Sequence, residues 1–298
     1  MTDMKRAVAL GFFDGIHLGH AALLRRTKEI AEEQGLEPAV MTFDTHPDTL
    51  VFGKEVPLIN SAREREEIIS RLFGIDKTIF LHFNRKLMTM PWKDFISSAV
   101  EELRIGAVIV GHDFSFGYRG EGKPWLLKAW CEEQGIQCEV IPAVYMDGKI
   151  ISSTEIRTLI AEGRIEDANR MLGHPHQLLD TVHTGYHLGQ KLGTPTINMM
   201  VPQGVVIPKH GVYATKVYID EEEPKIAVTN VGVRPTVSDA GSVSVESHLL
   251  DFTGNLYGRN ARLEFYFFQR EERKFSDMAS LAQQIQRDTE ETRRRFGE

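Results

Sequence analysis

The chain has few cysteines, no surplus of positive charge and no long hydrophobic run. Its 298 residues include two cysteines, Cys131 and Cys138, which by themselves cannot form a disulfide framework or a four-ligand zinc site. A reducing, cytoplasmic compartment is the simplest interpretation. The formal net charge is −7, whereas nucleic-acid-binding proteins usually carry a basic surplus. No apolar stretch approaches the roughly 20 residues of a membrane-spanning helix, and the amino terminus lacks a signal-peptide pattern. We therefore expect small-molecule partners, no nucleic acid and no membrane. The sequence does not indicate whether the chain forms oligomers.

The first half of the chain alternates short apolar runs with helical patterns. The apolar runs are Ala7–Leu10, Pro38–Phe43, Thr78–Phe83, Ile105–Val110 and Cys138–Ile141. Short runs without polar alternation are typical of strands that are buried on both faces, as in a parallel sheet. Strand and helix in alternation predict an α/β fold with a doubly wound parallel sheet.

The pattern changes after about residue 176. Four segments alternate apolar and polar residues between Gly, Pro, Asn and Asp turns: Gly211–Tyr218, Lys225–Val231, Val243–Leu250 and Arg262–Phe268. They predict an antiparallel sheet or a small barrel, and the charged segment Asp277–Phe296 predicts a closing helix. At roughly 100–200 residues per domain, we expect two domains, 1–175 and 176–298, with the linker near Gly173–Gln177.

A buried strand followed by a turn and two histidines forms the first candidate site. After Leu10 the sequence reads Gly-Phe-Phe-Asp-Gly-Ile-His-Leu-Gly-His, and a helical pattern follows. His17 and His20 are three residues apart, so their rings share one helix face, and Gly19 lets a ligand approach the backbone. A helix N-terminus with two imidazoles suits a phosphate whose charge grows in a transition state. Two exposed histidines without a function, or a zinc site completed by further ligands, are the alternatives.

Two further segments of the first half carry phosphate-binding chemistry. Residues 151–157 read Ile-Ser-Ser-Thr-Glu-Ile-Arg, in which Ser152 and Glu155 have the spacing of a capping box. The segment is therefore either an ordinary capped helix or an anion site made of hydroxyls, helix N–H groups and the Arg157 guanidinium. Residues 110–117, Val-Gly-His-Asp-Phe-Ser-Phe-Gly, form a strand end that opens into a loop, which is where open α/β sheets bind ligands.

The second half begins with a glycine-rich segment. Gly185, Gly189 and Gly193 recur every four residues, which is typical of a loop that folds over phosphates or of an ordinary flexible loop. Thr196 and Asn198 follow, and on a strand two residues that are two apart face the same side. Oxygen ligands of this kind suit Mg²⁺ that is shared with nucleotide phosphates.

A glutamate on a later predicted strand is the candidate base of the second half. The alternation in Val243–Leu250 turns Val243 and Val245 to the core and turns Ser244, Glu246 and His248 to the other side. Glu246 could take the proton of an attacking hydroxyl; a solvated strand glutamate is the common alternative.

The motifs of the first half together resemble a known family. Gly11–His20, Thr42–Pro47, Gly111–Gly117 and Ile151–Arg157 are similar, in this order, to the H-x-G-H nucleotidyltransferases. As a set they resemble the adenylyltransferase module of the bacterial riboflavin kinase/FAD synthetases, over residues 7 to about 172.

The motifs of the second half resemble the riboflavin kinase module that follows in the same family. The matching segments are Pro195–Asn198, Gly211–Tyr213, Asn230–Thr236, Val245–Phe252, Leu256–Gly258 and Arg270–Phe275. The resemblance implies a six-stranded antiparallel barrel closed by a C-terminal helix. The chain departs from the family at Gln190, where Arg is usual, and at Asp180, where Gly is usual; Ile197, His174 and His176 also differ.

The resemblance implies that riboflavin is phosphorylated to FMN and that FMN is adenylylated to FAD, with ATP as co-substrate and Mg²⁺ as cofactor. A monofunctional FAD synthetase with a degenerate kinase module is the alternative, because of Gln190 and Asp180. The site residues that the resemblance and the motifs imply are catalytic His17, His20 and Glu246; ATP- or phosphate-binding Gly11, Phe13, Gly19, Asp113, Ser152, Ser153, Thr154, Arg157, Gly185, Gly189 and Gly193; flavin-binding Pro47, Phe52, Phe114 and Arg270; and metal-binding Thr196 and Asn198.

Overall fold

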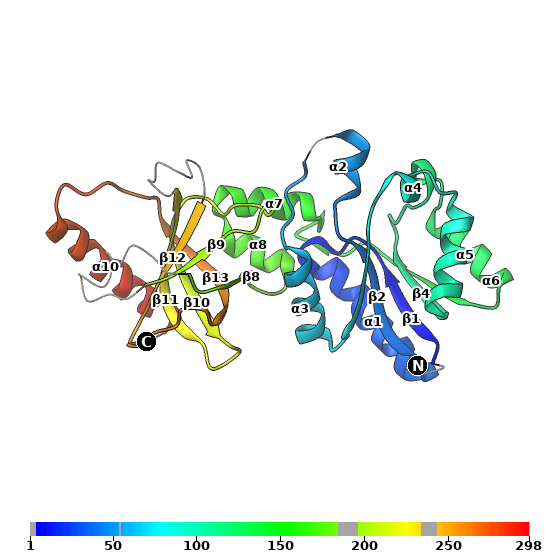
Figure 1. Cartoon of the computed structure of the whole chain (residues 1–298), viewed down its shortest axis with the longest axis horizontal. Coiled ribbons are helices and arrows are strands. Elements are labelled where there is room, and N and C mark those ends of the chain that lie inside the picture. The colour runs from blue at the N-terminus through cyan, green and yellow to red at the C-terminus, as the bar shows by residue number, and fades with distance from the viewer. Residues whose placement is uncertain (1–3, 54, 184–195, 234–242, 298) are drawn as a thin grey trace. The chain divides into compact units, whose positions relative to one another are not determined.

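The chain folds into two compact units, each with its own sheet (Figure 1). The structure is a computed structural model that describes residues 4–53, 55–183, 196–233 and 243–297. Unit 1 comprises Met1–Ser153 and unit 2 comprises Thr154–Glu298. The functional boundary expected between residues 175 and 176 stays a prediction. No helix in the described ranges is long and apolar enough to cross a membrane.

Unit 1 is built on a five-stranded parallel sheet with the strand order β3-β2-β1-β4-β5. The strands are β1 (Arg6–Leu10), β2 (Glu37–Phe43), β3 (Lys77–Leu81), β4 (Ile105–Gly111) and β5 (Gln137–Ile141). All five apolar runs of the sequence therefore form strands, and the predicted doubly wound parallel sheet is confirmed.

Helices cover both faces of this sheet, because successive residues of a strand point to opposite sides. In β1, Ala7 and Ala9 join the apolar cluster that α1 and α3 complete, while Val8 and Leu10 join the cluster of α5 and α6. The helices of unit 1 are α1 (Leu18–Gln34), α2 (Pro47–Phe52), α3 (Ala62–Phe73), α4 (Arg85–Met88), α5 (Trp92–Leu103) and α6 (Pro124–Glu133), and a small hairpin, β6 (Tyr145–Met146) with β7 (Lys149–Ile150), follows β5.

The strand order places a topological switch point between β1 and β4. The chain proceeds outward from β1 through β2 to β3, and then returns to the other side of β1 as β4. Leu10 lies opposite Val110, so the loops that follow both strands start next to each other. Open α/β sheets bind their ligands outside the carboxyl ends of the strands at such a point. The topology therefore brings together the two motifs that follow Leu10 and Val110.

Unit 2 contains a six-stranded antiparallel sheet with the order β8-β13-β10-β11-β12-β9. Its elements are α7 (Ser153–Glu162, which starts at the unit boundary), α8 (Ile165–Leu172), β8 (His176–Thr181), β9 (Thr196–Met200), β10 (Gly211–Ile219), β11 (Lys225–Val233), β12 (Val243–Leu249), β13 (Asn260–Arg270) and α10 (Met278–Phe296). The four expected strands and the final helix are confirmed. The short strands β8 and β9, which complete the predicted six, lie at the two edges of the sheet.

The sheet of unit 2 curls so that its two edges meet. The His183 backbone N–H donates a 2.8 Å hydrogen bond to the Asn198 carbonyl oxygen, which joins the chain after β8 to β9. A line of hydroxyls crosses the inner face, where Thr229 Oγ1 lies 2.7 Å from Thr215 Oγ1 and 2.8 Å from Ser247 Oγ. All three residues are fully buried, and these bonds satisfy polar groups that would otherwise destabilise the core.

Candidate functional site

Two stacked imidazoles occupy the switch point of unit 1. His17 is the N-cap of α1, and its Nδ1 accepts a 3.3 Å hydrogen bond from the His20 backbone N–H. The rings of His17 and His20 stack with centroids 3.7 Å apart and an angle of 15° between their planes. Because Nδ1 of His17 is an acceptor, the proton of its neutral ring resides on Nε2, which can donate to a phosphate oxygen. His17 is buried, so the alternative of two exposed histidines is wrong.

The backbone before His17 adopts a strained left-handed conformation that contacts with other segments stabilise. Phe13, Gly15 and Ile16 have positive φ angles of 55°, 83° and 46°, which cost free energy at Phe13 and Ile16 because these residues carry a Cβ. The buried Asp14 carboxylate accepts a 2.7 Å hydrogen bond from the Ile59 backbone N–H. The Asp14 carbonyl oxygen accepts a 2.8 Å bond from Ser153 Oγ. The turn is therefore fastened from two distant segments of the chain.

Glycine 19 serves the packing of the histidines. A Cβ at Gly19 would lie 2.9 Å from Cε1 of the His17 ring, which is closer than real Cβ contacts allow. The free space beside Gly19 therefore accommodates His17 itself. Gly11, at the end of β1, donates its backbone N–H to Met41 at 3.3 Å, and the Phe13 ring is buried 5.1 Å from the ring of His20.

The ionisation of His20 is set by its surroundings. Burial, then His17 and then Arg65 hold the pKa of His20 well below its usual value. His20 is therefore neutral at neutral pH. Its Nδ1 is buried and has no hydrogen-bond partner among the described residues. An imidazole N–H group at a helix N-terminus can donate a hydrogen bond to an anion.

The other predicted residues of unit 1 lie on the segments that follow β2 and β4 at the carboxyl edge of the sheet. Asp113 follows β4 and its side chain is 82% exposed, whereas Phe114 stacks on the buried Phe116 with ring centroids 5.1 Å apart. Pro47 is the first residue of α2. Phe52, at the end of that helix, is 73% exposed, which is unusual for a large apolar side chain and available to a planar ligand.

The segment 151–157 forms the start of α7. The helix begins at Ser153, which puts Ser152 at the N-cap position, as the capping spacing predicted. Ser153 Oγ is bonded to the Asp14 carbonyl oxygen. The Arg157 guanidinium donates a 3.1 Å hydrogen bond to Thr154 Oγ1. The anion-binding role of these residues stays a prediction.

In unit 2 the predicted metal ligands and base gather on one face of neighbouring strands. Asn198 of β9 lies directly opposite Glu246 of β12, and Thr196 lies opposite His248. Directly paired residues of neighbouring strands project to the same face. Asn230 of β11 lies opposite Glu246 on its other side and donates a 3.1 Å hydrogen bond to Glu272. An amide, a hydroxyl and a carboxylate therefore share one polar face.

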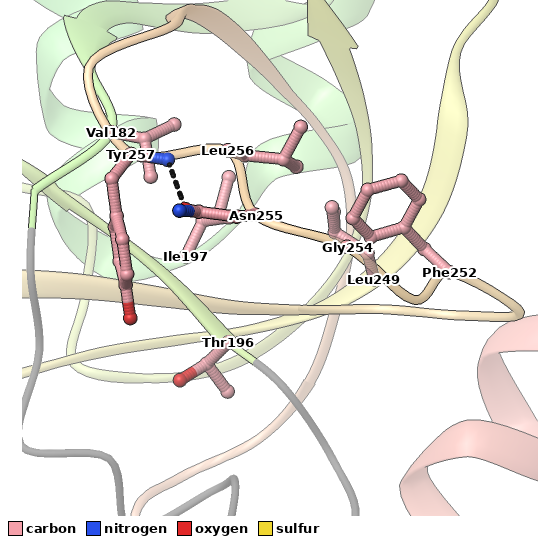
Figure 2. Close-up of a pocket in the computed structure, with 9 residues that line it drawn as sticks. All are labelled: Val182, Thr196, Ile197, Leu249, Phe252, Gly254, Asn255, Leu256 and Tyr257. Carbon is pink, nitrogen blue, oxygen red and sulfur yellow. Dashed lines mark hydrogen bonds between the residues drawn. The ribbon is translucent and has the colours of Figure 1, made fainter.

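A cavity of about 200 Å³ is lined by Thr196 and by residues from the other face of the sheet and from the loop after β12 (Figure 2). Its lining residues are Val182, Thr196, Ile197, Leu249, Phe252, Gly254, Asn255, Leu256 and Tyr257. Asn255 Oδ1 accepts a 3.0 Å bond from the Tyr257 backbone N–H, which folds the loop over the cavity. The three glycines Gly185, Gly189 and Gly193, together with Gln190, fall between Val182 and Thr196 and lie outside the described residues.

Asp180, which departs from the family pattern, closes the barrel. Its Oδ2 accepts a 2.8 Å hydrogen bond from the Met200 backbone N–H and lies 2.9 Å from Nε2 of His183. Asp180 therefore ties β8 to β9, the strand that carries Thr196 and Asn198. This residue has a structural function and is not by itself a sign of a degenerate module.

Arg270, predicted to bind flavin, forms a two-pronged ion pair with Asp288 of α10. The distances are 2.9 Å from Nε to Oδ1 and 2.7 Å from Nη2 to Oδ2, and both side chains are largely buried. The pair anchors the final helix to β13. Its flavin-binding role stays a prediction.

Several residues of the two sites were missed from the sequence. Asp14 was interpreted as part of a turn, and the structure shows that it anchors that turn. Arg65 lies in a run of charges, Arg-Glu-Arg-Glu-Glu, that resembles a solvated helix. Its spacing of three and four from Ile68 and Ile69 places it on the buried face, and that signal could have found it. Asn230 could be found only from the strand register.

Two family models match the chain in order. The model described as FAD synthetase matches residues 1–155, and the model described as riboflavin kinase matches residues 172–296. The stretch between them contains most of α7 and α8.

A solved structure shares this fold over almost the whole chain. It is described as a macrolide-efflux protein from Streptococcus pneumoniae, with a TM-score of 0.86, 27% identity and coverage of 98% of this chain and 95% of that one. The activity in this description is that of the Streptococcus pneumoniae protein. The structural similarity supports the fold of the present chain.

Curated relatives align along nearly the whole length. Proteins named bifunctional riboflavin kinase/FMN adenylyltransferase are 34% identical in Listeria monocytogenes, over 99% of this chain and 94% of the relative, and 33% identical in Bacillus subtilis, over 98% and 93%. The Escherichia coli protein of the same name is 34% identical over 97% of this chain and 92% of its own. The chain belongs to the family of bifunctional riboflavin kinase/FMN adenylyltransferases.

Proposed function

We propose that unit 1 transfers the adenylyl group of ATP to FMN and that unit 2 transfers the terminal phosphoryl group of ATP to riboflavin. The observation that carries the proposal is that two separate polar sites, one on each fold unit, coincide with the two matched family models. FMN, the product of the phosphoryl transfer in unit 2, is the substrate of the adenylyl transfer in unit 1. One chain therefore converts riboflavin to FAD.

In the adenylyl transfer, an FMN phosphate oxygen attacks the α-phosphorus of ATP, and the bond to pyrophosphate breaks. FMN supplies its own nucleophile, so the protein has to position the two phosphates and stabilise charge. In this proposal the N-terminus of α1 and the stacked rings of His17 and His20 donate hydrogen bonds to the phosphorus oxygens. The phosphate contacts of Asp113 and of residues 152–157, and the flavin contacts of Pro47, Phe52 and Phe114, remain predictions.

In the phosphoryl transfer, the riboflavin 5′-hydroxyl attacks the γ-phosphorus of ATP and ADP leaves. Glu246 is the candidate base for the hydroxyl proton, because it lies on the polar face opposite Asn198. A second cavity, of about 390 Å³, lies between His248 and α10 and is lined largely by apolar parts of that helix. We propose that this cavity takes part of the flavin ring.

The polar face of unit 2 fits Mg²⁺. A hydroxyl, an amide and a carboxylate are the hard oxygen donors that this ion prefers, with the remaining positions filled by phosphate oxygens and water. Thr196 and Asn198 would hold the ion, which would neutralise phosphate charge. Within the described residues there is no cluster of three or more His, Cys, Asp or Glu side chains that could hold a metal.

The compartment and the alternative activity follow from the same features. We propose that the protein works in the reducing cytoplasm, where free cysteines such as Cys131 and Cys138 are usual. A monofunctional FAD synthetase is not favoured, since the riboflavin kinase model matches residues 172–296 and Asp180 has a structural function.

One experiment tests the proposal. The purified chain is incubated with ATP and Mg²⁺ and with either riboflavin or FMN, and the flavins are separated by chromatography over time. We expect FMN and then FAD from riboflavin, FAD directly from FMN, and neither when EDTA replaces Mg²⁺. FAD from FMN without any FMN from riboflavin would identify the monofunctional alternative, and no conversion of either flavin would refute the proposal.

A further inference from the structure

One arginine of unit 1 is buried next to the turn that leads from β1 to His17. Arg65 belongs to α3 and is fully buried, on the helix face that also carries Ile68 and Ile69. A buried cation costs free energy unless hydrogen bonds and other charges compensate it. The contacts of Arg65 therefore have to compensate its burial, and they show which part of the fold the charge serves.

The guanidinium of Arg65 donates hydrogen bonds to the end of β2 and to the segment that follows β1. Nη1 donates to the Phe12 carbonyl oxygen at 2.8 Å and to Thr42 Oγ1 at 3.1 Å, and Nη2 donates to the Phe43 carbonyl oxygen at 2.9 Å. Thr42 Oγ1 donates to the same Phe12 oxygen at 2.8 Å. Phe12 follows β1, and Thr42 and Phe43 end β2. One side chain therefore fixes the point where the chain leaves β1 for the turn.

Aromatic rings hold the guanidinium in place. Its carbon lies 4.9 Å from the centre of the Phe12 ring and 5.3 Å from the centre of the Phe80 ring. Phe80 belongs to β3, so Arg65 contacts β2, β3 and the segment that follows β1 at the carboxyl edge of the sheet. The planar group suits stacking and several carbonyl acceptors at once, whereas the compact lysine ammonium does not.

The hydrogen bond from Arg65 to the Phe12 carbonyl oxygen holds the start of the turn that positions His17. Phe12 precedes Phe13 and Ile16, whose backbones are left-handed, and the turn leads to His17 at the start of α1. The Asp14 carboxylate fastens the middle of this turn, and Arg65 with Thr42 fastens its beginning. Without the Arg65 bonds, the entry of the strained turn keeps only the Thr42 bond to the Phe12 carbonyl oxygen.

Arg65 also places a positive charge beneath the site. Burial lowers the pKa of Arg65 to about 10, against the opposing effect of Asp14 and Asp44, so the group stays protonated at neutral pH. The charged or titratable groups that act on His20 are His17 beside it and Arg65 from α3, and both lower the pKa of His20. Arg65 thus helps to keep the imidazole neutral.

We propose that Arg65 is a positioning residue of adenylyl transfer, which holds the turn before His17 in its strained form and supplies a buried positive charge beneath the two histidines. It touches neither substrate by itself, since its side chain is fully buried. The inference rests on the proposed adenylylation of FMN by unit 1, and it separates a geometric effect, through Phe12, from an electrostatic one, through His20.

Two variants of Arg65 and one control test the inference. Arg65→Lys keeps the charge but cannot bind the Phe12 and Phe43 carbonyls together, and Arg65→Met removes both functions. Arg71→Met is the matched control, because Arg71 lies on the same helix, is exposed and pairs with Glu67. For each variant, kcat and KM for FMN and ATP are measured over a range of pH, together with riboflavin phosphorylation and with near-ultraviolet circular dichroism to determine the folded fraction.

We expect Arg65→Lys to lower kcat for FAD formation about tenfold per folded molecule, with the acid limb of the pH profile unchanged. Arg65→Met should lower kcat about a hundredfold, as expected for the loss of charged hydrogen bonds, and should move the acid limb to higher pH, because His20 then protonates more easily. Riboflavin phosphorylation and the Arg71→Met variant should match the parent protein.

If Arg65 has a purely structural role, the two variants should behave differently. In that case both Arg65 variants lower the folded fraction but keep the parent kcat per folded molecule and the parent pH profile, and this result would overturn the inference. If Arg65→Met does not fold, Arg65→Lys alone decides through kcat. If the parent protein makes no FAD from FMN, the proposed function fails and not the role of Arg65 within it.

Discussion

The two units place their polar groups in different ways. In unit 1 the candidate residues lie on loops and helix starts beyond the carboxyl ends of parallel strands, at the switch point between β1 and β4. In unit 2 they lie on the strands themselves, with Glu246 between Asn198 and Asn230 by register. Turn conformation and anchors thus determine the first site, and strand pairing determines the second.

The difference indicates how each site can fail. In unit 1, we expect a lost anchor to displace the turn and to leave the sheet intact, because Ile59, Thr42 and Arg65 hold the turn from outside. In unit 2, a shift of one residue in the register of β9 would turn Thr196 and Asn198 to the opposite face. Substitutions in the two units should therefore separate the two activities, and this can be tested on a single chain.

The largest expected effect is that of Glu246→Gln. Removing a general base typically lowers a rate about 10²–10⁴-fold, so FMN formation from riboflavin should nearly stop while FMN is still converted to FAD. Initial rates with riboflavin and with FMN as separate substrates measure this. Glu223→Gln, in an exposed turn of the same unit, is the matched control. A normal rate of riboflavin phosphorylation would show that Glu246 is only a strand residue.

The reverse separation is expected from His20→Ala. Loss of a group that stabilises the transition state typically lowers kcat about 10²–10³-fold, so FAD formation from FMN should be nearly lost while FMN still forms from riboflavin. The same chromatographic assay measures both activities. Unchanged FAD formation would exclude the stacked pair of His17 and His20 from the mechanism.

A smaller effect, confined to unit 2, is expected from Asp180→Ala. The variant loses the bonds to the Met200 N–H and to His183, and a charged hydrogen bond typically contributes about 1.5–3 kcal/mol. The free energy of unfolding of unit 2 should fall by a similar amount, and the KM for ATP in riboflavin phosphorylation should rise several-fold because β9 is less constrained.

Urea unfolding and kinetics at varied ATP measure these effects of Asp180→Ala. Asp180→Asn, which keeps an oxygen acceptor, should recover part of both. A change in FMN adenylylation instead of phosphorylation would contradict the assignment of Asp180 to the kinase half.

The smallest effect under ordinary conditions concerns a buried histidine of unit 2. Burial, with a contribution from His174, lowers the pKa of His176 from 6.5 to about 3. Neither ring nitrogen has a partner among the described residues, and the ring stacks on Phe265. The unfolded chain takes up this proton near its ordinary pKa while the folded chain does not. Stability is therefore lost as the pH falls from about 6.5 towards about 3, by at most about 1.4 kcal/mol per pH unit.

The variant His176→Phe should remove this pH dependence, since phenylalanine can stack on Phe265 without a proton to bind. The difference in unfolding free energy between the variant and the parent protein should grow as the solution is acidified, and denaturant titrations at several pH values measure it. A difference that stays constant with pH would show that His176 is protonated in both states or in neither.

Much of this fold could be predicted from the sequence because its signals are local. All five parallel strands were predicted from apolar runs, and α10 was predicted from its charges and periodicity. The strands β8 and β9 lack such runs: His176–Thr181 is partly polar and Thr196–Met200 follows a glycine-rich segment. These edge strands are stabilised by pairing with β13 and β12, which are distant in sequence.

The candidate sites were predictable where a motif lies within one turn or one strand. His17 and His20 share a helix face because of their spacing, and Glu246 and His248 share a strand face for the same kind of reason. Arg65 was missed because the charged residues around it suggest a solvent-exposed helix, although its position relative to Ile68 places it on the buried face.

The sequence by itself determined the order of the two modules, the chemistry of their motifs and the face on which each motif residue lies, because these depend on spacings of a few residues. Only the tertiary structure decided that Arg65, Ile59 and Ser153 all bond to one turn, and that Asp180 joins the two edges of a barrel. Contacts between segments many residues apart depend on how helices and strands pack, and no local pattern encodes which buried polar groups will find each other.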